Sequence, residues 1–365
     1  MVAQREIRFC KSSDGVELAV ALYGSGQPLV KAATWLTHIE LDQTSPFDRQ
    51  LIDEFTPHFR FVTYDARGCG LSERRVADIS LDAWVRDLET VVDSQGLQTF
   101  PLLGISQGAA IAVAYAARHP ERVSQLILMG GFASSYFTTG KVDDRIAQEA
   151  QTLLKVVELG WGSSSPAFRQ VFVSKFLPDA SAEQGRAFDE LQRATVTPQM
   201  AVRYLNAMFN INVKQLAPQV RCPTLALHVK GDQLIYFDQG RRLAALIPGA
   251  RFVPLEGNNH IPFVNEPAWA GFVHEVRAFL GTHTRPEKSP SAIALTARQL
   301  EVLRRVADGQ TDKQIARTLS LSPRTVEMHV AGAMRALASK TRAEAVHKAA
   351  DQGFLKPSPA AGQLR

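Results

Sequence analysis

The sequence predicts a large α/β domain, with a mainly parallel sheet and a helical cap, followed by a small all-α domain of four helices. Apolar strand-like runs alternate with amphipathic helix patterns through most of the first 280 residues. This order is typical of a parallel sheet that helices cover on both faces. After about residue 292 only helix patterns follow. The excess positive charge of the chain also lies in this last part.

Charge and composition narrow the classes of protein. Residues 291–365 hold twelve Lys and Arg against six Asp and Glu, whereas residues 1–290 hold twenty-nine against thirty. A basic excess confined to one small domain is expected of a nucleic-acid contact surface. Apolar residues make up 45% and charged residues 21% of the chain, which are values of a globular protein. No apolar stretch has the length of a signal peptide or a membrane span, so we expect a cytoplasmic protein without membrane contact.

Seven apolar runs predict the strands of the large domain. They are residues 16–23, 29–33, 59–64, 100–105, 125–129, 224–229 and 251–255. Residues 82–95 and 107–118 are amphipathic helices between them. Residues of roughly 135–218 show helical patterns only, including 143–159 and 198–209, which predicts a cap inserted over the sheet. We therefore expect domains at residues 1–281 and 292–356, separated by a polar linker at 282–291 and followed by a tail at 357–365.

The last seventy residues contain four helix-start signals. They are the capping boxes Thr296-x-x-Gln299, Thr311-x-x-Gln314 and Thr341-x-x-Glu344, and the pair Ser322-Pro323. Gly309 and Gly353 are placed to end two of the helices. Residues 311–319, a short turn and residues 323–337 form a predicted helix-turn-helix.

The second of these helices has an apolar and a mixed face. Val326, Val330, Ala333 and Leu337 recur at helical spacing, which predicts that they face the core. The side chains left to point outward are Arg324, Thr325, Glu327, Met328, Ala331 and Arg335. A face of this kind can enter the major groove of double-stranded DNA.

Residues 295–354 resemble the LuxR-type (NarL/FixJ-like) DNA-binding domain. The matching residues are Leu295, Thr296, Arg298, Glu301, Val302, Leu303, Gly309, Ile315, Ala316, Leu319, Ser322, Thr325, Val326, His329, Arg342 and Ala345. The resemblance implies that Thr325 and Arg342 contact phosphates and that Glu327, Met328 and Ala331 face base edges.

This chain departs from the family pattern at positions where lysine is common, namely Glu327, Ala331 and Ala336. Phosphate contacts must then come largely from Arg324, Arg335, Lys340 and Arg342. The family dimerises through its last helix, here residues 342–351. The small apolar face of Ala345, Val346 and Ala349 could serve a homodimer, or simply pack against the first helix of the domain.

The large domain carries a serine-hydrolase pattern. Gly104-Ile105-Ser106-Gln107-Gly108 follows a strand and opens a helix, as in a nucleophile elbow. In this fold the acid and then the histidine follow the serine, which favours Asp232 and His260 at two later strand ends. Asp238 is a competitor for the acid. The other histidines, His228 among them, lack a comparable setting and are interpreted as structural or exposed.

These residues resemble the α/β-hydrolase superfamily over about 280 residues. Further matches are the loop at residues 64–72 and the segments 257–260 and 266–267. The resemblance implies that the oxyanion hole is formed by the backbone amides of Trp35 and Gln107. The usual His-Gly pair of the first turn is replaced by Ala33-Thr34, and the loss of one oxyanion donor typically costs about a hundred- to a thousandfold in rate.

The sequence thus predicts a DNA-binding transcriptional regulator whose hydrolase-like domain senses a small ester, lactone or similar ligand, with slow hydrolysis. One alternative is an active serine esterase with an autoregulatory DNA-binding tail. Another is a catalytically dead hydrolase fold that serves as a dimerisation body. Cys10, Cys69 and Cys222 are too few and too scattered for a zinc cluster, and we expect neither a metal nor a cofactor.

Overall fold

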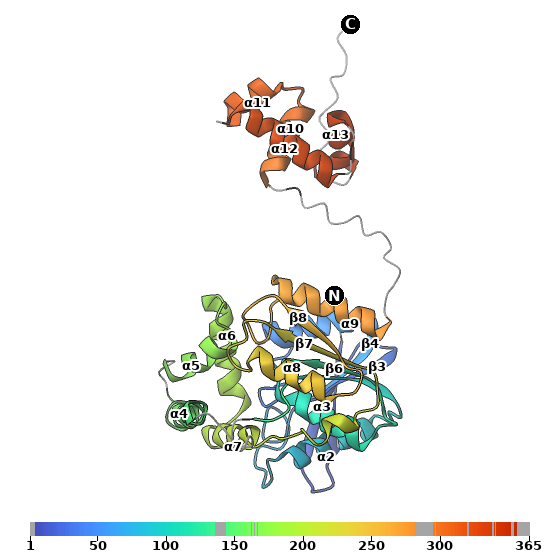
Figure 1. The fold of residues 1–365 in the computed structure, drawn as a ribbon, viewed down its shortest axis with the longest axis vertical. Helices are drawn as coiled ribbons and strands as arrows, with labels where there is room; N and C mark the ends of the chain where they lie inside the picture. The colour runs from blue at the N-terminus through green and yellow to red at the C-terminus, as the bar shows by residue number, and fades with distance from the viewer. Residues whose placement is uncertain are drawn as a thin grey trace. The chain divides into compact units, whose positions relative to one another are not determined.

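The computed structural model describes residues 4–135, 144–161, 163, 165, 167–281, 295, 297–319, 321–337, 339, 341–351, 354 and 355. The chain divides into two compact units, residues 1–282 and 283–365, which we call the large and the small unit (Figure 1). Within the described part of the chain, no helix has the length and apolar character needed to cross a membrane.

An eight-stranded sheet forms the centre of the large unit. In spatial order its strands are β1 (Arg5–Lys11), β2 (Glu17–Tyr23), β4 (Phe59–Tyr64), β3 (Gln27–Lys31), β5 (Phe100–Ile105), β6 (Val123–Met129), β7 (Thr224–Val229) and β8 (Arg251–Leu255). From β4 to β8 every neighbouring pair is parallel, whereas β1 and β2 add an antiparallel edge. All seven predicted strands are present, and β1 is an addition to them.

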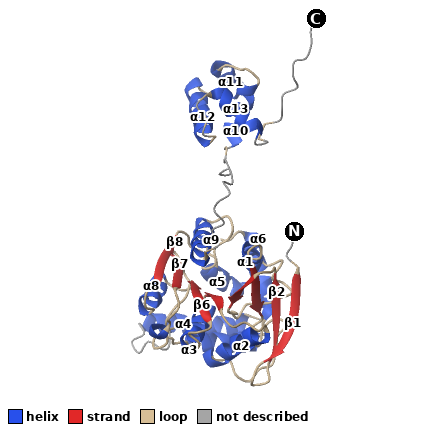
Figure 2. Ribbon diagram, turned by 90° about the vertical axis from the view of Figure 1, so that its right-hand side faces the viewer, coloured by secondary structure: helices blue, strands red, loops and turns tan. Residues whose placement is uncertain are grey.

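Helices cover both faces of this sheet (Figure 2). The covering helices are α1 (Pro46–Phe55), α2 (Leu81–Ser94), α3 (Gln107–Arg118), α8 (Phe237–Leu246) and α9 (Pro267–Leu280). Apolar residues of α2, α3 and α8 share one hydrophobic core, and those of α1 and α9 share the core on the opposite face. Helix α3 can lie close to the sheet because six of its twelve residues are alanine.

Four helices between β6 and β7 form the predicted cap, on the left in Figure 1. They are α4 (Asp144–Gly160), α5 (Ala167–Phe176), α6 (Ala182–Thr195) and α7 (Pro198–Phe209), and the short helix η2 (Ala217–Gln219) follows them. An isolated β-bridge between Ser134 and Asn212 joins the segment that leads into the cap to the segment that leads out of it.

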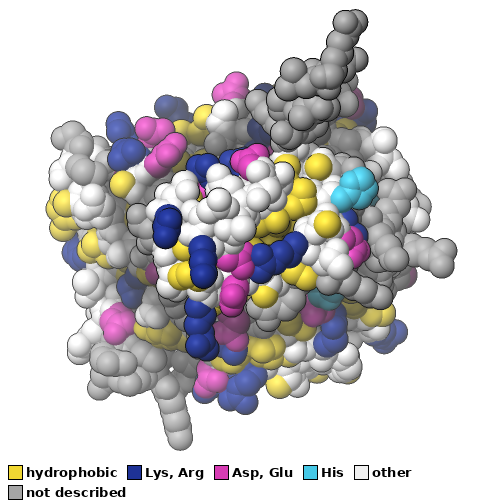
Figure 3. Space-filling model, turned by 90° about the horizontal axis from the view of Figure 1, so that it is seen from above, with side chains coloured by type: hydrophobic (Ala, Val, Ile, Leu, Met, Phe, Trp, Pro, Cys, Tyr) yellow, Lys and Arg dark blue, Asp and Glu magenta, His cyan; other side chains and the backbone are white. Residues whose placement is uncertain are grey.

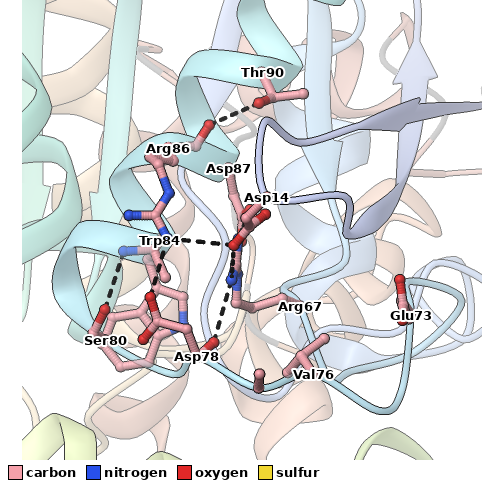
Figure 4. A network of polar contacts seen from close by, with 12 residues as sticks. Asp14, Arg67, Glu73, Val76, Asp78, Ser80, Trp84, Arg86, Asp87 and Thr90 are labelled. Atoms are coloured by element: carbon pink, nitrogen blue, oxygen red, sulfur yellow. Dashed lines mark hydrogen bonds and ion pairs between the residues drawn. The ribbon is translucent and has the colours of Figure 1, made fainter.

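Helix α7 ties the cap to a buried ionic network around Arg67, and Figure 4 shows the polar contacts of this network. The Tyr204 hydroxyl donates to the carbonyl oxygen of Arg67 (2.5 Å) and accepts from Trp84 Nε1 (3.3 Å). The fully buried Arg67 guanidinium forms ion pairs with Asp87 (2.6 Å) and Asp14 (2.8 Å). A charge this deep is tolerated only when it is paired and hydrogen-bonded. The cap is therefore anchored on one side through the loop that follows β4.

The small unit consists of α10 (Ala297–Ala307), α11 (Asp312–Leu319), α12 (Pro323–Ala336) and α13 (Arg342–Asp351). Three predicted helix starts carry capping bonds: Thr311 N donates to Gln314 Oε1 (2.8 Å), Thr325 N to Ser322 Oγ (3.1 Å) and Glu344 N to Thr341 Oγ1 (3.1 Å). Gly309 ends α10 with φ of 77°. The predicted cap residues Thr296 and Gly353 lie outside the described residues.

Candidate active site and DNA-binding surface

Ser106 stands at the sharp turn between β5 and α3. Among the described residues it is the one non-glycine residue with positive φ, at 55° with ψ of −123°. The glycines beside it permit the turn, because a Cβ on Gly104 would lie 2.6 Å from Ala109 Cα and one on Gly108 3.1 Å from the Ala32 carbonyl. Backbone strain of about 1–3 kcal/mol at one residue persists only where its surroundings enforce it. The motif predicted from the sequence thus forms a nucleophile elbow.

Asp232 and His260 meet at the ends of β7 and β8. His260 Nδ1 lies 2.6 Å from Asp232 Oδ2, and both side chains are fully buried. The second oxygen, Asp232 Oδ1, accepts from the backbone N–H of Leu234 (2.8 Å) and Ile235 (3.0 Å). The competitor Asp238 lies on α8, where its exposed carboxylate pairs with Arg241 (3.1 Å). The structure therefore brings His260 to Asp232 rather than to Asp238.

The second ring nitrogen of His260, Nε2, is not hydrogen-bonded within the described residues. A carboxylate only accepts, so His260 donates through Nδ1, and in a neutral imidazole Nε2 is then the acceptor. This buried Nε2 has no hydrogen-bond partner within the described residues, and no hydrogen bond joins it to Ser106 Oγ. The ring packs closely against the end of β6, since a Cβ on Gly130 would lie 2.9 Å from its Cε1. The imidazole of His260 is thus fixed by Asp232, while no hydrogen bond joins it to Ser106.

A second histidine, His228, reaches the same carboxylate. Its Nε2 lies 2.7 Å from the Ile235 carbonyl and 3.3 Å from Asp232 Oδ2. Burial alone would raise the pKa of Asp232, but His260 and His228 hold that pKa well below its usual range. His228 was interpreted from the sequence as structural or exposed, and it is a buried neighbour of the site. Its position four residues before Asp232, at the end of the same strand, was the available signal.

Two backbone amides at or beside the elbow, those of Gln107 and Trp35, have no acceptor within the described residues. The two segments lie side by side, because a Cβ on Gly108 would be 3.4 Å from both the Ala33 carbonyl and Thr34 Cγ2. Buried backbone donors are nearly always paired, so two free ones at this place suit the stabilisation of a developing oxyanion.

The turn that carries the Trp35 amide is held from the β4 loop. Thr37 Oγ1 donates to the Thr34 carbonyl (3.1 Å) and accepts from Ala66 N (3.1 Å). Cys69 Sγ donates to the Trp35 carbonyl (2.9 Å), and Asp65 accepts from Ile39 N (3.0 Å). These contacts define a fixed turn although Ala33-Thr34 replaces the His-Gly pair of the family pattern.

Two apolar pockets meet at Trp35 and Phe176. One is lined by Ser106 and Lys31 among mainly apolar side chains. The other is lined by residues of the cap helices α4, α5 and α7 together with residues that follow β6 and β7. Trp35 also packs against Trp161 and Phe172 of the cap region, with ring centroids 5.3 and 5.8 Å apart. The residue whose amide is a candidate oxyanion donor therefore has its side chain embedded in the cap.

The cap is also hydrogen-bonded to the histidine loop, residues 257–260. His260 N donates to the Phe176 carbonyl at the end of α5 (2.8 Å). Asp179 N donates to Asn259 Oδ1 (3.0 Å), and Asn258 Nδ2 donates to Asp179 Oδ2 (2.7 Å). A displacement of the end of α5 would therefore act directly on the loop that carries the base.

The outward face of α12 has the predicted composition. Arg324, Glu327, Met328 and Ala331 are exposed, and Met328 exposes 60% of its surface. The predicted inward stripe of Val326, Val330, Ala333 and Leu337 is buried. On the molecular face drawn in Figure 3, the coloured Lys and Arg side chains lie among Asp and Glu side chains. Lys340 and the side chain of Arg335 lie outside the described residues.

Arg342 is engaged within the small unit. Its Nη1 and Nη2 donate to the two carboxylate oxygens of Asp312, at 2.6 and 2.8 Å. This bidentate pair joins the start of α13 to the start of α11. Arg342 was predicted to contact phosphate, and such a contact would have to use its remaining donors or break the pair. The sequence signal for the pair was the single acidic residue in the first turn of α11.

The small apolar face of α13 points inward. Ala345 and Ala349 are fully buried in one core with Leu303 of α10 and Leu337, the residue that follows α12, and Val346 packs at the edge of this core. Of the two roles considered for this face, packing within the unit accounts for these contacts. As for metals, no group of three or more His, Cys, Asp or Glu side chains is placed to hold an ion in the described ranges.

Comparisons with known proteins identify both units. A family described as "alpha/beta hydrolase fold" matches residues 41–267, and "Bacterial regulatory proteins, luxR family" matches residues 294–349. The chain is 26% identical over 275 residues to the AB hydrolase superfamily protein YisY of Bacillus subtilis. This match covers 71% of this chain and 94% of that protein. It is 25% identical over 280 residues to a 2-hydroxy-6-oxo-2,4-heptadienoate hydrolase of Pseudomonas putida, covering 72% and 88%.

A solved structure with the same fold is an esterase from Exiguobacterium antarcticum. The TM-score is 0.64 at 23% identity, and the match covers 75% of this chain and 98% of that one. Together the family matches and this likeness confirm the predicted fold of both units. The luxR-family match also supports DNA binding by the small unit.

Proposed function

Because the chain belongs to the α/β-hydrolase fold family and ends in a luxR-family domain, we propose that it is a ligand-responsive transcriptional regulator. Its large unit binds a small ester, lactone or similar ligand between sheet and cap and hydrolyses it slowly. Its small unit binds double-stranded DNA. The partners of the chain are then DNA, the ligand and a second copy of itself.

The observation that carries this proposal is the hydrogen bonding between cap and histidine loop. A ligand in the pockets at Trp35 and Phe176 touches the end of α5. The Phe176 carbonyl accepts from His260 N, and Asp179 in the following loop bonds to Asn258 and Asn259. Asn259 Nδ2 in turn donates to Glu266 Oε1 (2.7 Å), and Glu266 is the N-cap residue of α9. Helix α9 is the last element before the segment that leads to the small unit. Ligand occupancy can bias DNA binding only if the two states of such an element bind the ligand differently.

The same residues would perform acyl transfer. His260 Nε2 takes the proton of Ser106 as its oxygen attacks the carbonyl carbon of the ligand, and Asp232 holds the imidazole in the required tautomer. The N–H groups of Trp35 and Gln107 stabilise the negative charge on the carbonyl oxygen. The proton then passes to the departing alcohol, and water cleaves the acyl-serine.

Slow turnover suits the geometry of the site. The hydrogen bond from Ser106 to His260 is not formed, and the position of His260 depends on a carbonyl of the cap. Catalytic hydrogen bonds often tighten only when a ligand is bound. A ligand that shifts the end of α5 would move His260 into hydrogen-bond distance of Ser106. The same shift would change the contacts through which ligand binding affects DNA binding.

The first part of the test measures the nucleophile. Full-length protein is treated with a fluorophosphonate probe, and we expect labelling of the wild type that is lost in Ser106→Ala. An esterase with a DNA-binding tail would be favoured if the protein is labelled and also hydrolyses a panel of esters so rapidly that no ligand complex accumulates. No labelling would favour a hydrolase fold that serves only as a dimerisation body.

The second part measures communication. Operator fragments selected from random duplexes with the full chain are titrated with protein, with and without the ester and lactone panel, for wild type and Ser106→Ala. We expect at least one compound to change DNA affinity in Ser106→Ala, and two chains per bound duplex. Asp179→Ala, which removes the side-chain bond to Asn258, should weaken the response and leave DNA binding without ligand unchanged. DNA affinity that ignores every bound compound would refute the sensor.

A further inference from the structure

A lysine lies in the wall of the pocket that contains Ser106. Lys31 is the last residue of β3 and pairs in the sheet with Leu103 of β5. Its side chain is only 5% exposed. Lysine is almost never fully buried unless it is paired, since removing an ammonium group from water is costly. Its position therefore calls for a partner.

The protein supplies only a distant one. Lys31 Nζ lies 3.6 Å from Asp48 Oδ1, which is beyond hydrogen-bond length, and no residue in the described ranges accepts a hydrogen bond from it. Asp48 has other support, because its Oδ2 accepts from Ser45 Oγ (3.2 Å). Asp48 also lies in the first turn of α1, where the helix end favours a negative charge. The ammonium donors are thus available in the pocket.

The rest of this pocket is mainly apolar. Lys31 and Ser106 line it together with Thr34 and Asp48, and all the other lining residues are aliphatic or aromatic. A buried cation in such surroundings interacts strongly with an anion, because water does not screen it. A carboxylate is a suitable group, since it accepts short, charge-assisted hydrogen bonds from ammonium.

We propose that Lys31 binds a carboxylate of the ligand while the ligand's ester or lactone carbonyl lies at Ser106. The ligand class is then an acid ester: an acyl carbonyl and a free carboxylate joined by an apolar spacer. This inference rests on the proposed function, because it names the ligand of the same pocket. Asp48 opposes the anion and sets a limit to its affinity.

The test uses full-length Ser106→Ala, which binds without turnover, and calorimetry at constant salt. The probes are the monomethyl esters of straight-chain diacids from succinate to suberate, each beside the neutral methyl ester with the same number of acyl carbons. We expect one or more half esters to bind about ten- to a hundredfold more tightly than their neutral partners, the size of one hydrogen bond to a charged group. Lys31→Met should abolish this preference and keep the affinity for the neutral esters.

Asp48→Asn separates ligand recognition from a merely structural ion pair. If Lys31 binds the ligand, removal of the competing carboxylate raises the affinity for half esters. If the lysine only balances Asp48, the variant loses thermal stability and gains no affinity. A preference that survives in Lys31→Met, or no preference and no half-ester binding at any length, overturns the proposal.

The proposed function fails separately. Half esters that bind through Lys31 and leave DNA affinity unchanged would contradict the sensor and keep this inference. Neutral esters that change DNA affinity, without any preference for half esters, would contradict this inference and keep the sensor.

Discussion

Asp65 is a fully buried carboxylate beneath the segment that carries the Trp35 amide. It accepts hydrogen bonds from the backbone N–H of Leu71 (2.7 Å) and Ile39 (3.0 Å). Burial outweighs these bonds and raises the pKa of Asp65 to about 7, and the nearby carboxylates of Asp42 and Asp48 add to the rise. The charge of the carboxyl group that supports the candidate oxyanion turn therefore changes with pH near neutrality.

This link predicts that the large unit is more stable in mild acid. In the unfolded chain the pKa of Asp65 returns to about 4. Between about pH 4 and pH 7 the folded protein keeps a proton that the unfolded chain has lost, so the free energy of unfolding falls as pH rises, by up to about 1.4 kcal/mol per pH unit. We expect a higher thermal midpoint at pH 5.5 than at pH 7.5 by circular dichroism. Asp65→Asn, which does not titrate, should flatten the dependence, and a midpoint that rises with pH in the wild type would contradict it.

Residues with a fixed place in a local motif could be predicted, and residues that depend on long-range packing could not. Ser106 follows from its glycines, and Asp232 and His260 follow from chain order at strand ends. His228 and Lys31 are the last or next-to-last residues of β7 and β3. A polar residue there shows its neighbours only after the sheet is assembled. The roles of Ser106, Asp232 and His260 stay predictions until the nucleophile is tested.

At the scale of elements, α7 is the helix that fixes the cap to the body of the large unit. Besides Tyr204, Arg203 donates to the carbonyl oxygens of Val76 (2.7 Å) and Ala77 (2.6 Å). Tyr204 also stacks on Trp84 of α2, with ring centroids 5.4 Å apart. One end of the cap is thus anchored by α7, whereas α5 bonds to the histidine loop.

Loss of the Tyr204 hydroxyl should weaken this anchor. Tyr204→Phe leaves the Arg67 carbonyl and the Trp84 indole N–H without their buried partner, which costs about 1–3 kcal/mol. Tyr115→Phe is a matched control, since Tyr115 is equally buried and its hydroxyl has no partner within the described residues. We expect urea denaturation to show a lower midpoint for Tyr204→Phe and little change for Tyr115→Phe. Equal losses in the two variants would show that the hydroxyl contacts do not anchor the cap.

Elements with a complete local pattern were predicted best. The bounds of α3 and α7 agree with the predicted residues 107–118 and 198–209, because a turn motif or a Thr-Pro cap marks their starts. Strand β1 was missed because it is an edge strand without a fully buried residue, so it has no apolar run. Within the cap, α5 and α6 were expected only as helical patterns, since their packing partners lie far along the chain.

For the whole molecule, the excess charge of the small unit is partly compensated inside it. Arg342 pairs with Asp312 (2.6 Å), Arg298 with Glu301 (2.6 Å) and Lys348 with Glu344 (2.8 Å). Arg324 is exposed at the N-terminal end of α12 and has no ion pair within the described residues. Phosphate binding by this unit should therefore depend more on Arg324 than on Arg342, contrary to what the family pattern alone implies.

The salt dependence of DNA binding measures this difference. Each phosphate contact releases counterions, so the logarithm of the binding constant falls linearly with the logarithm of salt concentration, with a slope of about −0.9 per contact. We expect the affinity of the full chain for a duplex to fall steeply between 50 and 200 mM salt, and Arg324→Ala to reduce the slope by about 1.

Arg342→Ala should leave the slope nearly unchanged and lower the thermal midpoint of the small unit, because it breaks the ion pair between α11 and α13. Arg241→Ala, on an exposed helix of the large unit, is the control for a lost charge. A flat binding curve would argue against DNA binding through phosphate contacts, and a slope lost in Arg342→Ala but kept in Arg324→Ala would assign the phosphate contact to Arg342.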